Sequence, residues 1–430
     1  MPDLIHRIPS LVLIDHTFSV PLDYSQPDGA HINVFAREVV TPGWEHDNQP
    51  MLVFFQGGPG SHAPRPGDNG GWLGRALKEY RVLLLDQRGT GLSTPVNHQT
   101  LARFKTAQEQ ADYLKHFRAD NIVRDAEFIR AELLGAGVKW SALGQSYGGF
   151  CITTYLSIAP EGLREAFITG GVPPALRSAD EVYRATYKRV MDKNQLYFQR
   201  YPEDVERVRQ IVDVLNSQTV CLPQGDQLTA RRFQQIGLSF GASNGFEEIH
   251  YLLEKAFVEG ANGSELGYDF LWGVEEQTDY AAHPIFAILH ESIYGQGSAT
   301  RWAAERVCAE YPEFEIRPDQ PIYFTGEMIY SWMFDDYRYL QPMKQAAELL
   351  AAEENWSPLY DLSVLENNTV PVAATAYYND MYVERQYAEE TAQHIRGIKL
   401  WITNEYEHNA LRADGDRVLD RLIKMVRGEL

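Results

Sequence analysis

The sequence predicts an α/β fold in which a mostly parallel central sheet carries helices on both faces and is interrupted by an inserted helical domain. Three observations predict this fold. A short apolar strand leads into the turn Gly144-Gln145-Ser146-Tyr147-Gly148, which is followed by an apolar helix that ends at Pro160. Other apolar strands alternate with helical segments, which is typical of a parallel sheet. An aspartate and a histidine follow two strands near the C-terminus.

The turn at Ser146 matches the G-x-S-x-G pattern of a nucleophile elbow, a tight turn between a strand and a helix. The serine there needs a strained backbone, and we expect a Cβ at either glycine to collide with the neighbouring strand or helix. The pattern alone is weak, because it arises by chance in about 10% of chains of this length. The apolar helix 151–159 and the strand 166–170 that follow it make Ser146 a candidate nucleophile rather than an idle turn residue.

The composition is that of a globular protein with an excess of acidic residues. The 430 residues suffice for one large core plus an inserted domain, and 44% of them are apolar. The 39 basic and 59 acidic residues give a formal net charge of −20, which argues against nucleic acid or an anionic membrane as the partner. We find no secretory signal and no apolar stretch of transmembrane length, and therefore expect a cytoplasmic protein. The three cysteines are widely spaced and predict no disulfide framework.

Three further segments supply strands before the elbow. Residues 16–40 alternate polar and apolar around a turn, which predicts an antiparallel pair at a sheet edge. The continuous apolar runs 50–55 and 81–86 predict strands that are buried on both faces. At the end of the last strand, we expect Asp86 and Arg88 to form a charged pair that rigidifies the loop.

The character of the chain changes near Pro173, where aromatic and charged helical segments replace the alternation of strands and helices. Strands resume at 369–378 and 397–402, and a last helix is expected over 409–426. The predicted organisation is a core formed by residues 1–172 and 359–430, with a helical domain inserted over 173–358.

The glycine-rich stretch Gln56-Gly57-Gly58-Pro59-Gly60 follows the strand 50–55. It has neither the Gly-Lys-Ser/Thr of a phosphate-binding loop nor a helix-opening G-x-G-x-x-G, so nucleotide binding is disfavoured. A bare N–H at the end of a strand ahead of the elbow can instead point at the carbonyl that the serine attacks. We predict an oxyanion hole formed by the N–H groups of Gly58 and Tyr147.

A serine hydroxyl needs a histidine base to attack a carbonyl, and the histidine needs a carboxylate to orient it. In this architecture the acid and then the histidine follow the serine along the chain. Asp380 lies just past the strand 369–378 and His408 just past the strand 397–402, so we predict a triad with Ser146. The competing interpretations are a helix N-cap for the aspartate and a surface histidine near a helix start. The alternative acids are Asp361, Glu384 and Glu407.

Three stretches, in this order and spacing, resemble the proline iminopeptidases (prolyl aminopeptidases) of the α/β-hydrolase class, in their longer bacterial form. They are Gln56 to Gly60, Asp86-Gln87-Arg88-Gly89-Thr90-Gly91 and Gly144 to Gly149. The resemblance covers most of the chain. It implies an α/β-hydrolase fold with a helical cap domain and the removal of an N-terminal proline from small peptides. Many members have histidine where Gln56 stands, and often Gly-Arg-Tyr-Asp where this chain has Tyr378-Asn379-Asp380.

In such enzymes, glutamates of the cap hold the charged imino group of the substrate. The segment His290-Glu291-Ser292-Ile293-Tyr294 is similar to the cap segment that carries the first of them. The resemblance therefore implies this role for Glu291 and, as the second glutamate, for Glu327. A carboxylate among aromatic residues can pair with a desolvated ammonium, although a solvated helix face is the alternative. The aromatic side chains expected around the proline ring are Tyr147, Phe150, Trp272 and Tyr294.

The sequence thus predicts a serine aminopeptidase that releases an N-terminal proline through an acyl-enzyme, without a cofactor. His283 and His290 are too far apart for a two-histidine helical metal site, so no metal is predicted. The first alternative is an esterase or amidase of the same fold that takes a different acyl group. The second is a hydrolase-like binding module without catalysis, which the presence of serine, acid, histidine and oxyanion glycines disfavours.

Overall fold

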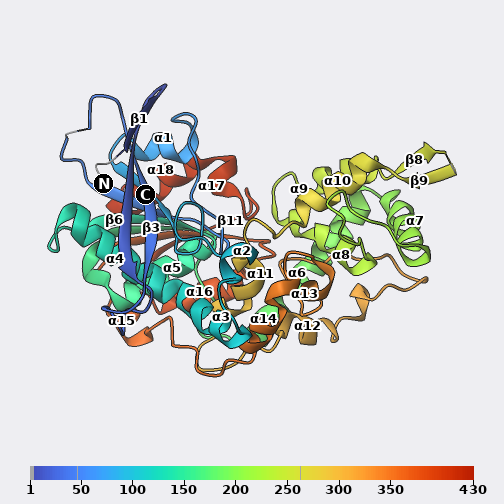
Figure 1. Cartoon of the computed structure of the whole chain (residues 1–430). Coiled ribbons are helices and arrows are strands. Elements are labelled where there is room, and N and C mark those ends of the chain that lie inside the picture. Colours follow the sequence, from blue (N-terminus) through green and yellow to red (C-terminus); the bar gives the residue numbers. More distant parts are fainter. Residues whose placement is uncertain (1–3, 46, 262) are drawn as a thin grey trace.

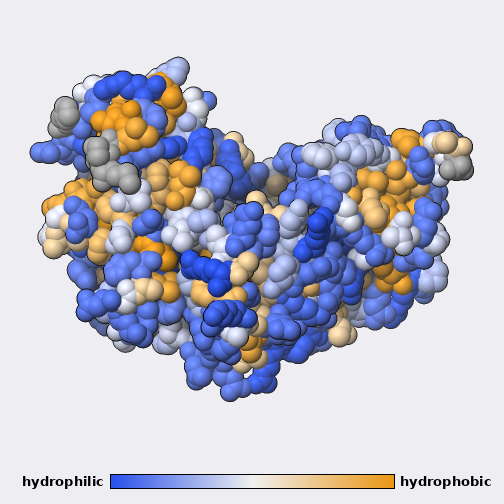
Figure 2. All heavy atoms as spheres, viewed as in Figure 1, coloured by the Kyte–Doolittle hydropathy of each residue, from blue (hydrophilic) through white to orange (hydrophobic). Residues whose placement is uncertain are grey.

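The structure is a computed structural model that describes residues 4–45, 47–261 and 263–430. Figure 1 shows a lobe built on a large sheet and, beside it, a mostly helical lobe; both chain ends lie on the sheet lobe. Figure 2 shows that the surface is hollowed between the two lobes and is largely hydrophilic on this face. None of the helices in the described ranges combines the length and the apolar character needed to span a bilayer.

The large sheet is formed by β1 (Leu4–Ile8), β2 (Leu11–Pro21), β3 (His31–Val40), β4 (Met51–Phe55), β5 (Arg81–Asp86), β6 (Trp140–Gln145), β7 (Leu163–Thr169), β10 (Val372–Tyr377) and β11 (Lys399–Thr403). Its order is β1-β2-β3-β5-β4-β6-β7-β10-β11. The pairs up to β3·β5 are antiparallel and all later pairs are parallel. This confirms the predicted mostly parallel sheet with an antiparallel edge, to which β1 adds a strand that was not predicted.

The helices of the sheet lobe cover both faces of the sheet. They are α1 (Gly71–Ala76), α2 (His98–Leu101), α3 (Ala107–Leu114), η1 (Lys115–Phe117), α4 (Ala119–Leu134), α5 (Tyr147–Ile158), η2 (Pro160–Gly162), α15 (Leu362–Glu366), α16 (Arg385–Gln393), α17 (Ala410–Ala413) and α18 (Gly415–Arg427). In β4, Val53 and Phe55 belong to the core under α4 and α5, whereas Leu52 and Phe54 belong to the core under α1 and α18. Because alternate side chains enter different cores, a continuous apolar run is what this strand requires.

The second lobe lies between β7 and β10 in the chain. It comprises α6 (Ala179–Arg200), α7 (Asp204–Ser217), α8 (Ala230–Gln234), η3 (Gln235–Gly241), α9 (Gly245–Leu253), β8 (Phe257–Gly260), β9 (Gly263–Leu266), α10 (Tyr268–Gln277), α11 (Ile285–Leu289), η4 (Glu291–Tyr294), α12 (Ala303–Cys308), η5 (Pro312–Phe314), α13 (Met333–Asp336), η6 (Gln341–Met343) and α14 (Lys344–Ala351). A helical insertion was expected here. The β8–β9 hairpin was not, and the limits at residues 173 and 358 stay predictions.

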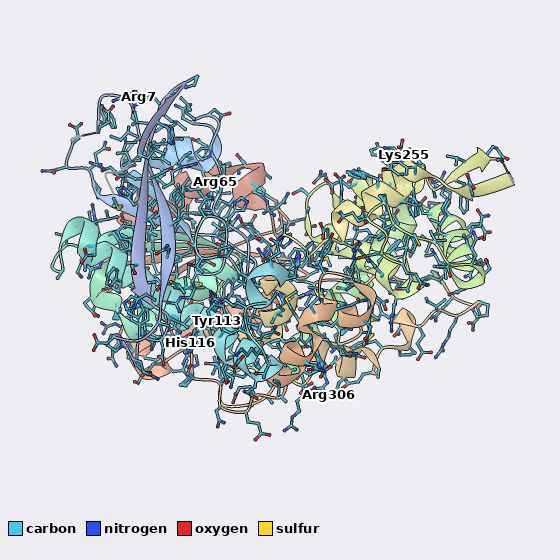
Figure 3. All side chains as sticks on the ribbon, viewed as in Figure 1. Arg7, Arg65, Tyr113, His116, Lys255 and Arg306 are labelled. Carbon is cyan, nitrogen blue, oxygen red and sulfur yellow. The ribbon has the colours of Figure 1, made fainter. Side chains whose placement is uncertain are left out.

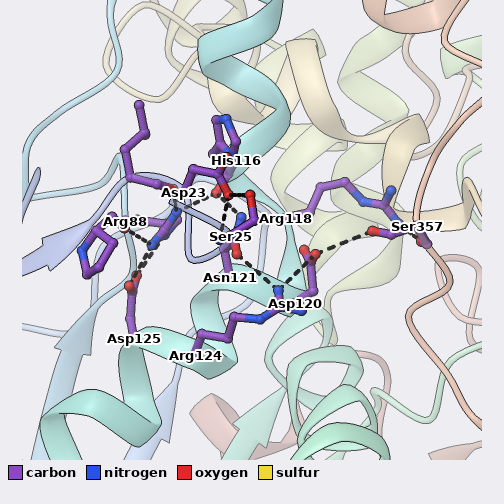
Figure 4. Close-up of polar contacts among 12 residues, drawn as sticks. Asp23, Ser25, Arg88, His116, Arg118, Asp120, Asn121, Arg124, Asp125 and Ser357 are labelled. Carbon is purple, nitrogen blue, oxygen red and sulfur yellow. Dashed lines mark hydrogen bonds and ion pairs between the residues drawn. The ribbon is translucent and has the colours of Figure 1, made fainter. Parts of the chain in front are cut away.

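The expected pairing of Asp86 with Arg88 is wrong, because each residue pairs elsewhere. The buried guanidinium of Arg88 donates to both carboxylate oxygens of Asp125, at 2.7 and 2.6 Å (Figure 4). Asp86 pairs with Arg65, which is labelled on the sheet lobe in Figure 3, and accepts the N–H of Ala63. Both charged residues hold loops in place, but through partners that are distant in the sequence.

The register of the sheet brings several loops to one edge. Phe55 pairs with Gly144 and Gln145 with Thr169, while Tyr377 pairs with Thr403. The parallel strands β4, β6, β7, β10 and β11 therefore have their carboxyl ends on the same side of the sheet, which is where ligands of open α/β sheets bind. The loops that follow these strands carry the residues of the candidate site.

Candidate active site

Ser146 occupies the sharp turn between β6 and α5. Its backbone has φ +55° and ψ −125°, a conformation that side-chain-bearing residues rarely adopt and that marks stored strain. A Cβ added at Gly144 would lie 2.3 Å from the carbonyl oxygen of Gly148, and one added at Gly148 would lie 2.0 Å from that of Phe55. These distances confirm the expected collisions, so the turn requires glycine at both places.

Substitution of Gly148 by alanine is expected to destabilise the protein by about 3 kcal/mol or more, because the new methyl group meets backbone that cannot move aside cheaply. Thermal unfolding monitored by circular dichroism measures the effect. Gly137→Ala is the matched control, since no atom of the described residues lies within 4 Å of a Cβ at that position. Equal unfolding temperatures for the two variants would contradict this account of the turn.

His408 and Asp380 form a buried pair at the ends of β11 and β10. Nδ1 of His408 lies 2.7 Å from Oδ2 of Asp380, while Oδ1 of Asp380 accepts the N–H groups of Tyr382 and Val383 at 2.9 and 3.1 Å. The aspartate thus caps a turn and orients the histidine at the same time. Burial alone would lower the pKa of His408, but the charge of Asp380 and its hydrogen bond outweigh burial and raise it.

The other acids considered from the sequence have different partners. Asp361 accepts the N–H groups of Ser363 and Val364 at the start of α15. Glu384 pairs with Arg189, and Glu407 pairs with Lys193. Of the four candidate acids, Asp380 is the one that bonds to His408.

Two consecutive glycines after β7 lie against both Ser146 and His408. A Cβ at Gly171 would be 2.1 Å from the carbonyl oxygen of Ser146, and one at Gly170 would be 3.3 Å from Nδ1 of His408. Nε2 of His408 is buried and has no hydrogen-bond partner among the described residues, so no hydrogen bond joins it to Ser146 in this structure. In enzymes without substrate this bond is often long, and Nε2 is free to accept the hydroxyl proton. The Gly-Gly pair directly after a strand was a signal that the sequence analysis missed.

The glycine loop after β4 lies beside the serine. A Cβ at Gly57 would be 3.0 Å from Cβ of Ser146. Within the described part of the chain, the N–H groups of Gly58 and Tyr147 donate to no other protein group. Tyr147 begins α5, where unpaired N–H groups and the helix dipole favour negative charge.

The helical lobe contacts the loops on both sides of the serine. Ile285 of α11 lies over the glycine loop, because a Cβ at Gly60 would be 2.8 Å from Cβ of Ile285. On the other side, the carbonyl oxygen of Gly241 accepts the N–H of His408 at 3.0 Å. The helical lobe therefore forms a cap that helps to hold the loop of His408.

Glu291 is buried, and its carboxylate accepts hydrogen bonds from the start of a helix. Its two oxygens accept the N–H groups of Ala303 and Ala304 at 3.0 and 2.8 Å, at the beginning of α12. Burial raises the pKa of Glu291 to about 7, although these N–H groups oppose the shift. The side chain is 6% exposed, so it is not part of a solvated helix face.

Glu327 is a mostly buried carboxylate of the helical lobe, with 15% of its side chain exposed. Among the described residues it makes no hydrogen bond, and its Oε2 lies 4.0 Å from Nε2 of His290. Burial raises the pKa of Glu327 to about 8, the charge of His408 opposes the shift, and that of Asp380 adds to it. The charge of Glu327 in turn helps to raise the pKa of His408, so the two groups interact electrostatically.

Three of the four predicted aromatic residues form one cluster. Ring centroids of Tyr147 and Phe150 are 6.2 Å apart, and those of Phe150 and Tyr294 are 6.3 Å apart. The structure does not bring Trp272 to this cluster: its side chain is 45% exposed on α10, where it stacks on Tyr268. An aromatic residue in a helix can cover the surface, and the sequence pattern did not distinguish this from a pocket.

A cavity of about 690 Å³ lies apart from the site, between the β2–β3 turn, the start of α4 and residues 353–357 (Figure 4). None of the residues around Ser146 lines it. Among the described residues, no three His, Cys, Asp or Glu side chains are grouped to hold a metal ion.

The fold and the site define a hydrolase of the α/β-hydrolase class, with a serine at the elbow followed in the chain by the acid and the histidine. The family described as alpha/beta hydrolase fold matches residues 50–239. Within this class, the chain belongs to the proline iminopeptidase family. It is 52% identical over 413 residues to the proline iminopeptidase of Aeromonas sobria, and the match covers 96% of each chain.

A second relative comes from a fungus. The chain is 36% identical over 419 residues to the proline iminopeptidase aneH of Aspergillus aculeatus, which covers 95% of this chain and 92% of that protein. Among solved structures, 2-hydroxy-6-oxo-6-phenylhexa-2,4-dienoate hydrolase from Rhodococcus sp. strain RHA1 is similar, with 14% identity, a TM-score of 0.43, and coverage of 96% of this chain and 99% of that one.

Proposed function

We propose that this enzyme releases an N-terminal proline from small peptides. The observation that carries the proposal is Glu327, a carboxylate that makes no hydrogen bond within the described residues and interacts electrostatically with His408 and Asp380. A carboxylate of this kind, only 15% exposed to solvent, attracts a cation, and the free N-terminus of a peptide is one. The net charge of −20 supports a peptide substrate rather than a nucleic acid. The cytoplasmic location stays a prediction.

In the proposed reaction, Oγ of Ser146 attacks the carbonyl carbon of the N-terminal proline while Nε2 of His408 takes the hydroxyl proton. Asp380 keeps the imidazole in the required tautomer. The N–H groups of Gly58 and Tyr147 stabilise the negatively charged oxygen. His408 then gives its proton to the departing amine as the C–N bond breaks, which leaves proline as an ester on Ser146. Water attacks this ester while His408 takes its proton, and His408 returns the proton to Oγ of Ser146 as the ester bond breaks and proline leaves.

The position of Glu327 would restrict cleavage to one residue. An ammonium held by this carboxylate is attached to the carbon next to the attacked carbonyl, so only the first peptide bond can reach Ser146. Phe150 and Tyr294 lie in the aromatic cluster that begins next to the serine and offer apolar contact to the proline ring. Glu291 would act indirectly, by fixing the start of α12.

Glu327→Gln is expected to raise KM for a proline arylamide about 30-fold, corresponding to about 2 kcal/mol, with little change in kcat, because a charged partner of the substrate is lost. In the free wild-type enzyme Glu327 is protonated below about pH 8, so binding a cation must release a proton. We therefore expect 1/KM to rise with pH up to about 8 in the wild type, and this rise to be absent in the variant. Steady-state kinetics across this range measures both effects.

The control for this experiment is Glu259→Gln, which removes an exposed carboxylate on β8 and should leave KM unchanged. An unchanged KM in Glu327→Gln would remove the basis for placing the ammonium at this residue.

The proposed function is tested with arylamides of proline and of N-acetylproline and with simple esters. A kcat/KM at least 100-fold higher for free proline than for N-acetylproline supports it, since acetylation removes the charge. Comparable values for both arylamides, or a strong preference for simple esters, would indicate an amidase or esterase instead.

A further inference from the structure

His290 is a buried polar residue to which the mechanism above gives no role. Its side chain is 1% exposed, and neither ring nitrogen has a hydrogen-bond partner among the described residues. Buried polar groups without partners are rare in proteins because they are destabilising, so a retained one points to function. Nε2 of this ring lies 4.0 Å from Oε2 of Glu327, the carboxylate assigned to the substrate ammonium.

The surroundings of His290 keep its imidazole uncharged. Its ring centroid lies 4.8 Å from that of Phe286 and 6.3 Å from that of Tyr294. Burial among these rings lowers the pKa of His290 to about 4. A neutral imidazole has one N–H donor and one nitrogen that accepts a hydrogen bond, whereas the protonated form has no acceptor. An acceptor is therefore available at neutral pH beside Glu327.

The spacing of the two groups suits an N-terminal proline. Proline differs from other N-terminal residues in that its nitrogen is a secondary ammonium with two N–H bonds instead of three. Two acceptors 4.0 Å apart can each lie about 2.9 Å from one nitrogen placed between them. A primary ammonium in the same place would keep a third N–H without an acceptor, at a cost in affinity.

We propose that His290 is a specificity-determining residue: its acceptor nitrogen and the carboxylate of Glu327 each accept one N–H of the imino group of an N-terminal proline. This inference rests on the proposed function. His290 adds a neutral acceptor to the charged acceptor of Glu327. These two acceptors match the two N–H bonds of a secondary ammonium.

The test compares kcat/KM for the arylamides of proline and N-methylproline, whose tertiary ammonium has a single N–H. In the wild type, the proline substrate should be preferred. His290→Leu should lower kcat/KM for proline about 20-fold, mainly through KM, and change that for N-methylproline less than threefold, so that the preference falls about tenfold. His290→Gln should recover part of the preference, because its amide oxygen is an acceptor.

Glu327→Gln is the matched control. It should lower kcat/KM for both substrates alike, because Glu327 accepts the N–H that the two substrates share. Equal losses for the two substrates in His290→Leu would overturn the proposal and leave His290 a structural role only. If His290→Leu does not fold, His290→Phe, which keeps a ring but has no acceptor, takes its place and the same two outcomes apply. A wild-type enzyme without activity on proline arylamide would instead contradict the proposed function itself.

Discussion

Replacement of Ser146 by alanine is expected to lower kcat for a proline arylamide by about 10⁶-fold. In the proposed mechanism Oγ of Ser146 forms the acyl-enzyme, and no other group on the strained turn can replace it. Substrate affinity should change less than threefold, because in the proposed binding mode Glu327 holds the ammonium and aromatic side chains contact the ring. Single-turnover kinetics gives the rate, and calorimetric titration gives the affinity.

Ser157→Ala is the matched control, since this serine lies in α5, the helix that begins directly after Ser146, and its hydroxyl donates to the carbonyl oxygen of Thr153. It should retain kcat within a few-fold. A Ser146→Ala variant with more than about 1% of wild-type kcat would show that another nucleophile operates.

Asp380→Asn should lower kcat by about 10⁴-fold, the second largest effect. Oδ2 of Asp380 lies 2.7 Å from Nδ1 of His408 and fixes the proton there. An asparagine amide can donate to Nδ1 instead, which places the proton on Nε2 and removes the base. Kinetics with a proline arylamide measures the loss.

The same substitution should shift the pH dependence. The charge and hydrogen bond of Asp380 raise the pKa of His408 against the opposing effect of burial, so the wild-type rate increases with pH through a raised pKa. Loss of the charge should move this increase to lower pH in the variant. Asp361→Asn is the control: it weakens the start of α15 but should leave both kcat and the pH profile unchanged. A larger kcat loss in Asp361→Asn than in Asp380→Asn would reassign the acid.

Local patterns account for the parts of the fold that could be predicted from the sequence. The apolar run of β4 indicates a buried strand because its side chains alternate between two cores, and the elbow needs glycine for reasons that lie within a few residues of Ser146. The β8–β9 hairpin has no such pattern, since its residues are mostly exposed and include glycine at the ends. Short exposed strands of this kind do not stand out from loops.

Partners that are distant in the sequence explain what could not be predicted. Arg88 pairs with Asp125, 37 residues away, rather than with its neighbour Asp86. Glu291 is used at the start of α12, which no residue spacing reveals. The proximity of His290 to Glu327 depends on how the cap folds back on itself. Asp380 and His408 could be identified because chain order and strand ends place them at the same edge of the sheet.

The most direct test of the central claim is covalent labelling with a fluorophosphonate, followed by mass spectrometry of peptides from the labelled protein. The account predicts one phosphonylated residue, Ser146, with labelling slowed by a proline arylamide and abolished in Ser146→Ala. An enzyme that cleaves the proline arylamide but carries the label on another residue, or carries none, would contradict the account.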